Sequence, residues 1–261
     1  MPENTILATR DGHIATVTLN RPHKLNAFTR PMWKRLGVVI RELSADDTVR
    51  CIVIRGAGGK AFSPGNDISE FEAERSSKAQ ARDYGRDISL TLTSLSECRH
   101  PIVALIEGIC VGGGLEVAAH CDIRICGESS RFGVPIKRLG LVLAYPEIAG
   151  LLKLVGPATV MEILLEGRIF TAAEALQRGL VTRVVADSKV EDEAFASARN
   201  IAEGAPLVAR WHKKFARRLM NNHAPLRPEE LDEGYACYET EDFQIGYKSF
   251  LAKTKPDFKG R

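Results

Sequence analysis

Apolar and polar positions alternate along the first part of the chain and later recur at helical spacing. Residues 5–9 and 13–20 alternate around an Asp-Gly dipeptide, a combination typical of a β-hairpin. From Arg30 the apolar positions recur every three or four residues, and a proline in the first turn favours a helix there. Residues 49–55 alternate again. Strands that alternate with helices predict an α/β fold.

Helical spacing dominates from about residue 190 onward, with prolines between the segments. We therefore expect a core domain over residues 1–190 and a helical region over residues 191–261. Within the core domain, residues 72–81 are polar without a clear period and predict a mobile loop. Thr171 and Glu174 form a predicted capping box. The expected helices of the last part cover 190–203, 206–220, 228–239 and 241–252.

Composition narrows the class of protein. The 261 residues are 44% hydrophobic and 26% charged, as in ordinary soluble enzymes. A net charge of +3, with basic and acidic residues spread along the chain, gives no case for nucleic-acid binding. No apolar run reaches the roughly 20 residues of a membrane span, and the first residues lack a signal-peptide pattern, so we expect a cytoplasmic protein. Six cysteines without a C-x-x-C pair indicate buried, reduced thiols.

The stretch with most chemical content covers residues 108–122. A short apolar strand, 102–106, leads into three consecutive glycines at 112–114, and a helix of small and apolar residues follows over 115–119. Glycines let a ligand approach the backbone, and the N–H groups of a first helical turn can hold a developing negative charge. Glu116 lies in that same turn. A carboxyl group in an apolar helix is costly to bury unpaired, so it is either satisfied or catalytic.

Phosphate-binding loops do not fit these glycines. Gly59-Lys60 is followed by Ala61 instead of the Ser or Thr of a Walker loop. The dinucleotide pattern G-x-G-x-x-G fails from Gly112, because its last position is Val117. An oxyanion-binding turn beside an acid–base group and a purely structural turn remain as the two interpretations.

A second strand followed by a glycine-rich turn, over residues 49–68, resembles the first. Together the two segments resemble the crotonase superfamily, also called the enoyl-CoA hydratase/isomerase family, and the resemblance covers nearly the whole chain. It implies an α/β spiral of ββα units with a helical C-terminal region, assembled as a homotrimer or as a hexamer built from two trimers. The motifs that carry it, in order, are 19–27, 61–68, 112–116, 132–135, 172–181 and 250–258.

The resemblance also implies the reaction centre. The backbone N–H groups of Asn66 and Gly113 match the two oxyanion-hole donors, which stabilise an enolate formed from a CoA thioester. Glu116 matches the first of the two glutamates that hydratases use. The second is absent, because Phe132-Gly-Val-Pro135 is followed by Ile136.

Three nearby side chains are candidates to replace the missing carboxylate. Glu147 and Tyr145 lie where relatives carry a glycine-rich helix start. His120 lies four residues after Glu116, on the same face if the helix continues that far. A lone buried histidine is more often structural, so Glu147 is included among the candidate catalytic residues.

Contacts with coenzyme A follow from the resemblance alone. Coenzyme A is expected as part of the acyl-CoA substrate, and neither a resident cofactor nor a metal is expected. The matching residues come from the early loop, the second glycine-rich segment and the C-terminal tail, which in relatives often reaches another subunit. They are Lys24, Leu25, Ala27, Ala61, Asp67, Ile68, Phe250 and Lys253.

We therefore expect an enzyme that stabilises the enolate of an acyl-CoA thioester, with hydration of an enoyl-CoA as the first hypothesis. One alternative is enoyl-CoA double-bond isomerisation, in which Glu116 moves a proton between carbons. Another is an acyl-CoA-binding protein that has lost its chemistry, which the replacement at Ile136 would favour.

Overall fold

A computed structural model describes residues 4–261. The chain opens with the expected hairpin, in which β1 (Ile6–Asp11) and β2 (Ile14–Leu19) pair antiparallel. The helix α1 (Arg30–Ala45) follows, and β3 (Cys51–Gly56) then pairs parallel to β2. The elements predicted for the first 56 residues are therefore confirmed.

From β3 onward, three successive pairs of strands each contribute one strand to each of two sheets. β3, β5 (Ile102–Ile106) and β7 (Ile123–Gly127) lie in the six-stranded sheet, whose order is β1-β2-β3-β5-β7-β10. β4 (Ala61–Ser63), β6 (Ile109–Val111) and β8 (Arg131–Gly133) lie in the second sheet, whose order is β4-β6-β8-β9. Each strand pair is followed by helix, so the chain forms the expected α/β spiral of ββα units.

Alternation along β3 divides its side chains between two apolar layers. Ile52 and Ile54 point into the main core, which α1 and α3 (Lys78–Glu97) help to fill. Cys51 and Val53 point to the other face, where they meet α7 (Val190–Glu203). The six-stranded sheet is therefore covered on both faces, which is the situation that favours long apolar runs in parallel strands.

The predicted loop over residues 72–81 is instead largely helical. α2 (Phe71–Glu74) occupies its start, and α3 already begins at Lys78. Ser77 caps α3, because its hydroxyl accepts from Gln80 N while the Gln80 side chain accepts from Ser77 N. The amphipathic spacing of α3 begins only further along, so its polar first turns were mistaken for a loop.

The last third of the chain follows the predicted helical spacing, except that the third helix is interrupted. Thr171 and Glu174 form the predicted capping box at the start of α6. Past α7, the long helix α8 ends in a linker, and the segment predicted as 228–239 is split into α9 and a 3₁₀ turn. The elements are α4 (Gly113–Ala119), α5 (Tyr145–Met161), the π-helical turn η4 (Glu162–Glu166), β9 (Phe170–Thr171), α6 (Ala172–Gln177), β10 (Arg183–Val185), α8 (Pro206–Asn221), α9 (Pro228–Glu233), η6 (Ala236–Glu239) and α10 (Glu241–Ala252).

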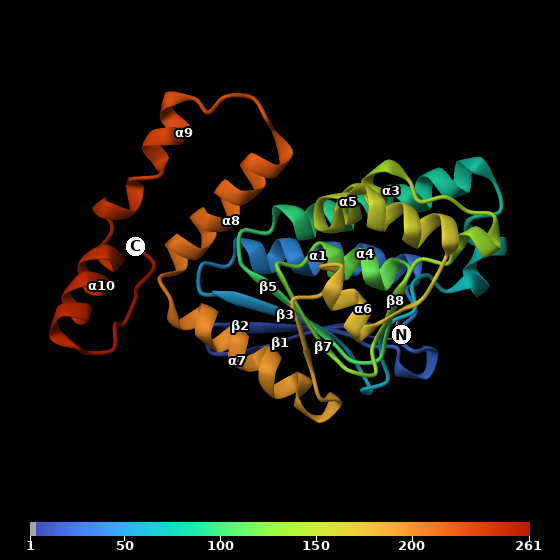
Figure 1. The fold of residues 1–261 in the computed structure, drawn as a ribbon, viewed down its shortest axis with the longest axis horizontal. Coiled ribbons are helices and arrows are strands. Elements are labelled where there is room, and N and C mark those ends of the chain that lie inside the picture. The colour runs from blue at the N-terminus through green and yellow to red at the C-terminus, as the bar shows by residue number, and fades with distance from the viewer. Residues whose placement is uncertain (1–3) are drawn as a thin grey trace.

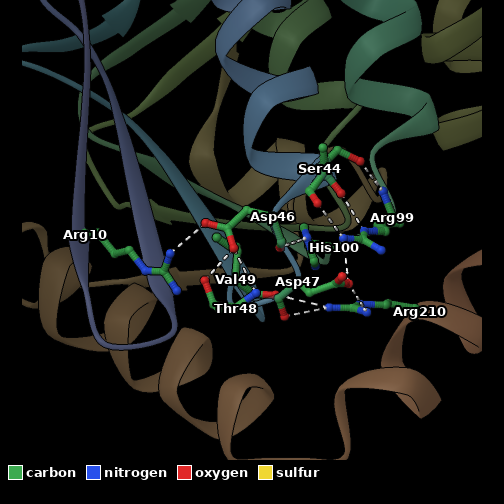
Figure 2. A network of polar contacts seen from close by, with 10 residues as sticks. Arg10, Ser44, Asp46, Asp47, Thr48, Val49, Arg99, His100 and Arg210 are labelled. Atoms are coloured by element: carbon green, nitrogen blue, oxygen red, sulfur yellow. Dashed lines mark hydrogen bonds and ion pairs between the residues drawn. The ribbon is translucent and has the colours of Figure 1, made fainter. Parts of the chain in front are cut away.

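Polar contacts fasten α8 to the connection between α1 and β3 (Figure 2). Arg210, from α8, donates to the Asp47 side chain at 3.2 Å and to its carbonyl at 3.1 Å. Arg99 forms a second ion pair with Asp47 at 2.9 Å, and Arg10 of β1 pairs with Asp46 at 2.7 Å. These contacts join segments far apart in the sequence and fix where the chain leaves the core.

Beyond α8, the helices α9 and α10 lie on its outer side, away from the sheets (Figure 1). Ion pairs tie α9 back to α8, among them Arg218 to Glu230. The final residues lie beside α10, where Lys259 N and Gly260 N donate to Asp242. Arg50, just before β3, donates to the Phe258 carbonyl at 2.7 Å. α7 packs on the six-stranded sheet, and the division of the chain at residue 190 stays a prediction.

Within residues 4–261, one helical stretch, Tyr145–Glu166, is long and apolar enough to cross a membrane by length and composition, with a mean hydropathy of 1.7. The sequence expectation counted only uninterrupted apolar runs and so passed over it. The stretch bends at Gly156, whose φ is 72°, next to Pro157. Its first turn faces the pocket described below, so it is built into the fold.

All six cysteines are free thiols, and five of them are buried. Burial raises the pKa of the Cys51 and Cys121 thiols to about 12, which keeps both in the unreactive protonated form. The prediction of buried, unpaired cysteines is confirmed for five, while Cys237 is half-buried.

Candidate active site

A cavity of about 260 Å³ opens where the two glycine-rich turns meet the start of α5. Two walls form it. The glycine wall comprises residues 63–66 and 111–116, and the α5 wall comprises residues 135–147. The half-buried side chains of Phe71 and Arg75 close the side between the two walls. The lining residues are Pro64, Gly65, Asn66, Ile68, Phe71, Arg75, Val111, Gly112, Gly113, Glu116, Pro135, Ile136, Arg138, Leu139, Leu141, Val142, Leu143 and Glu147.

Close backbone packing fixes the glycine wall. Gly65 has a φ of +100°, and a Cβ added there would lie 2.9 Å from Gly113 N. A Cβ on Gly114 would lie 2.3 Å from the Ser63 carbonyl oxygen, and one on Gly113 would lie 2.8 Å from the Trp33 ring. Distances below 3.0 Å leave no room for a side chain, so the two turns can approach only as glycines.

This packing leaves two N–H groups at the pocket without partners. Within residues 4–261, neither Asn66 N nor Gly113 N donates a hydrogen bond to the protein, although both residues line the pocket. Their neighbours are satisfied, since Gly65 N donates to Ser63 Oγ and Asp67 N to the Phe28 carbonyl. An oxyanion hole requires two free donors at one site, and this pocket has two such N–H groups.

The Asn66 side chain is held by the scaffold. Its Oδ1 accepts a 2.7 Å hydrogen bond from the indole N–H of Trp33. Trp33 is fully buried and stacks on Phe28, with ring centroids 4.2 Å apart. The Asn66 Oδ1 therefore anchors the turn, and the backbone N–H lies free at the pocket.

Glu116 lies in α4 at the bottom of the pocket, 3% exposed. Its Oε2 has no hydrogen-bond partner among residues 4–261. Burial raises the pKa of Glu116 well above its usual value, the neighbouring Glu147 carboxylate raises it further, and the Arg75 charge opposes both. A buried carboxyl group that is unpaired and faces a cavity is a strong candidate for acid–base chemistry.

Glu147 supplies the second carboxyl group, at the position that sequence reasoning gave it. It is 9% exposed and lies in the first turn of α5, where its Oε2 accepts from Ala144 N. Burial raises the pKa of Glu147, while the Ala144 N–H and Arg75 oppose that shift. Ile136 lines the same pocket from the turn η3 (Ile136–Leu139), so the pocket holds a second carboxyl group on α5 although position 136 is apolar.

The other two candidates do not reach the pocket. Tyr145 is 92% exposed and is not among the lining residues. α4 ends at Ala119, and the Nδ1 of His120 contacts the Glu116 carbonyl while its ring packs against Gly150. Burial lowers the pKa of His120, so the ring is neutral and structural at physiological pH.

Arg75 is the pocket residue that sequence reasoning missed. It lies at the end of α2, inside the stretch interpreted as a loop, and carried no recognisable pattern. Its guanidinium stacks on Phe71 at 4.8 Å and on Tyr84 at 4.9 Å from the ring centroids. Only its charge next to the two glutamates identifies it.

The residues predicted to contact coenzyme A are dispersed. Ile68 lines the pocket and is 51% exposed, whereas Asp67 is held by Arg21 through two 3.1 Å contacts. Lys24 and Leu25 are exposed in the early loop, and Ala27 and Ala61 are buried. Phe250 and Lys253 lie on and just after α10, beyond α8, and line no part of this pocket within one chain (Figure 1).

A family model described as enoyl-CoA hydratase/isomerase matches residues 9–261. The chain belongs to the enoyl-CoA hydratase/isomerase family. The match covers all the elements that build the pocket, from α1 to α5, as well as the C-terminal helices.

Similar proteins point the same way. The chain is 32% identical over 263 residues to the short-chain-enoyl-CoA hydratase of Clostridium acetobutylicum, with complete coverage of both chains. It is 33% identical over 260 residues to the carnitinyl-CoA dehydratase of Salmonella arizonae, covering 97% of each. A crystal structure described as an enoyl-CoA hydratase/carnithine racemase from Magnetospirillum magneticum superimposes with a TM-score of 0.97 at 46% identity, covering 99% of this chain and 96% of that one.

Proposed function

We propose that the protein hydrates 2-enoyl-CoA thioesters, with Glu116 and Glu147 as the acid–base pair. One observation carries the proposal. Two buried carboxyl groups share an otherwise mostly apolar pocket with two N–H donors that have no partner within residues 4–261. Family membership and the names of the similar hydratases support it.

The donors at Asn66 and Gly113 bind the thioester carbonyl oxygen. When a nucleophile adds to C3 of a 2-enoyl thioester, negative charge moves to that oxygen as an enolate forms. Two fixed N–H donors stabilise the enolate more than the ground-state carbonyl, and the loss of one such donor typically raises the barrier by about 2.7–4 kcal/mol.

The environments of the two glutamates assign their roles. Glu116 is the more deeply buried and has no partner on Oε2, which favours its protonated form. Glu147 accepts from Ala144 N in the first turn of α5, where the helix dipole favours an anion. Glu147 therefore takes a proton from water as the oxygen bonds to C3. Glu116 gives its proton to C2, so that H and OH add across the double bond.

The test is turnover of crotonyl-CoA, followed as loss of the conjugated thioester absorbance. We expect the wild type to consume crotonyl-CoA and Glu116→Gln to lower kcat by about 10³-fold, within the range of general acid–base catalysis. Glu166→Gln removes an exposed carboxylate on η4, outside the pocket, and serves as the matched control. A wild type that binds crotonyl-CoA and leaves its absorbance unchanged contradicts hydration.

A 3-enoyl-CoA substrate separates hydration from double-bond isomerisation. An isomerase converts it to the conjugated 2-enoyl ester and increases the absorbance. Tight binding of both esters without turnover of either identifies a binding protein.

We also propose that the chain acts in the cytoplasm as a homotrimer or a hexamer. Exposed apolar side chains on α8, η6 and α10 support this, including Leu219, Tyr238 and Phe250. Assembly would let the tail of one chain, with Phe250 and Lys253, reach the coenzyme A bound to another. Light scattering should give three or six times the 28.7 kDa of one chain; a monomer would contradict the assembly.

A further inference from the structure

Arg75 is rigidly placed at the pocket. It follows the last residue of α2, and its guanidinium lies over the rings of Phe71 and Tyr84. Tyr84 is fully buried in α3, so one of the two faces that hold the guanidinium belongs to the core. Stacking on aromatic faces orients a guanidinium and leaves its N–H edge free to donate.

That edge is not used by the protein. Among residues 4–261, the Arg75 side chain forms no ion pair within 4.0 Å and no hydrogen bond. Nearby arginines differ: Arg30 pairs with Glu74 and Asp87, and Arg21 pairs with Asp67. An arginine that is fixed, half-buried and unpaired at a pocket is suited to bind an anionic group of a ligand, because it can donate two parallel hydrogen bonds.

The residues that line the pocket indicate where the anionic group of the ligand would lie. The N–H groups of Asn66 and Gly113 hold the thioester end, and Glu116 and Glu147 act at C2 and C3. Arg75 and the two glutamates line the same pocket, so we place the guanidinium beside the part of the acyl chain that extends past the reacting carbons. A cavity of about 260 Å³ is below the usual ligand-pocket range of roughly 300–1,000 Å³, which indicates a short acyl chain.

We propose that Arg75 binds a carboxylate at the far end of a short acyl chain, so that the preferred substrates are CoA thioesters of dicarboxylic acids. This inference rests on the proposed function for the direction in which the thioester lies. Glu116 does not oppose a bound carboxylate, because burial favours its neutral form. Glu147, which is ionised in the proposed reaction, repels a second carboxylate, and the fixed charge of Arg75 offsets that repulsion. The rest of the acyl surface is apolar, with Ile68, Phe71 and Leu143 on its walls.

Binding of two saturated esters tests the proposal without any chemistry. Glutaryl-CoA and pentanoyl-CoA have acyl chains of equal length, and only the first ends in a carboxylate. We expect calorimetry to show wild-type protein binding glutaryl-CoA at least about tenfold more tightly, the effect of charge-assisted hydrogen bonds. Equal dissociation constants for the two esters would overturn the proposal, whatever the variants do.

Variants assign the preference to a residue. Arg75→Gln should reduce the preference to less than about twofold while pentanoyl-CoA still binds as in the wild type, and Arg75→Lys should keep part of it. Arg82→Gln, on the exposed side of α3, is the matched control and should change neither constant. If the preference survives in Arg75→Gln and is lost in Arg138→Gln, the exposed arginine at the pocket is the anion site and the assignment to Arg75 is wrong.

Turnover of two 2-enoyl esters of equal chain length, glutaconyl-CoA and pent-2-enoyl-CoA, separates this inference from the proposed function. A clear preference for glutaryl-CoA with no hydration of either enoyl ester contradicts hydration and supports anion recognition by Arg75. Hydration of both enoyl esters with equal kcat/KM, together with equal binding of the saturated esters, supports hydration and contradicts the recognition.

Discussion

The two walls of the pocket are built in different ways. In the glycine wall, the proposed oxyanion donors are backbone N–H groups whose positions depend on contacts such as that of Gly65 with Gly113 N. In the α5 wall, the proposed acid–base group is the side chain of Glu147, held by one N–H at a helix start. A backbone donor can be supplied only where the two turns meet, whereas a carboxyl group can reach the same space from a different residue. Ile136 and Glu147 together illustrate this: position 136 is apolar, and the carboxyl group enters from α5.

The largest effect should follow from a side chain added to the glycine wall. Gly65→Ala places a Cβ against Gly113 N at a φ of +100°, so both oxyanion donors must move. We expect kcat for crotonyl-CoA to fall by about 10²–10³-fold. Gly85→Ala is the matched control, because a Cβ there meets nothing within 4 Å in α3. That control should leave kcat unchanged and raise the stability by about 0.5–1 kcal/mol. Equal kcat values for the two variants would show that the wall tolerates displacement.

The pH dependence of kcat/KM should report the ionisation of Glu116 in the glycine wall and of Glu147 in the α5 wall. Hydration needs Glu147 ionised and Glu116 protonated, and both pKa values lie above the usual 4.5. We therefore expect kcat/KM to rise tenfold per pH unit until Glu147 has lost its proton, and to fall at higher pH when Glu116 loses its own. Glu147→Gln should remove the acidic limb alone. An unchanged acidic limb in that variant would assign the limb to another group.

A smaller effect is expected from loosening the glycine wall without adding atoms. Trp33→Phe keeps an aromatic ring against Phe28 but removes the hydrogen bond to Asn66 Oδ1. The loss of one such bond is worth about 1 kcal/mol, so kcat should fall roughly fivefold with little change in KM. A larger KM with unchanged kcat would show that Trp33 shapes ligand binding instead of the donor position.

The smallest expected effect is on thermal stability. Glu116→Gln, which should lower activity, should make the folded protein more stable. The raised pKa of Glu116 means that the folded protein holds this proton more tightly than the unfolded chain does. Stability due to this group is therefore greatest at low pH and is lost as the pH rises above about 4.5. Glu116→Gln should raise Tm at pH 8 by about 2–4 °C for each kcal/mol by which the buried, ionised carboxylate destabilises the fold. The increase should be smaller at pH 4. A lower Tm at pH 8 would mean that the carboxylate is stabilised by contacts.

Much of this architecture could be predicted from the chain because its signals are local. Alternation gives β1 to β3, and the glycines with Glu116 mark the glycine wall. The start of α3 could not be found, since its first turns are held by the Ser77 cap and Gln80 instead of by buried side chains. Arg75 could not be found either, because its role depends on Phe71, Tyr84 and two glutamates that come together only in the fold. Glu147 could be nominated, but its closeness to Glu116 required the structure.

The central claim is that the second carboxyl group of the reaction lies on Glu147 in place of residue 136. The most direct measurement is crotonyl-CoA turnover by the wild type, by Glu147→Gln, and by Glu147→Gln combined with Ile136→Glu. We predict a loss of about 10²-fold in the single variant and a recovery of at least tenfold in the double variant, because Ile136 lines the same pocket. Wild-type turnover in Glu147→Gln would contradict the claim.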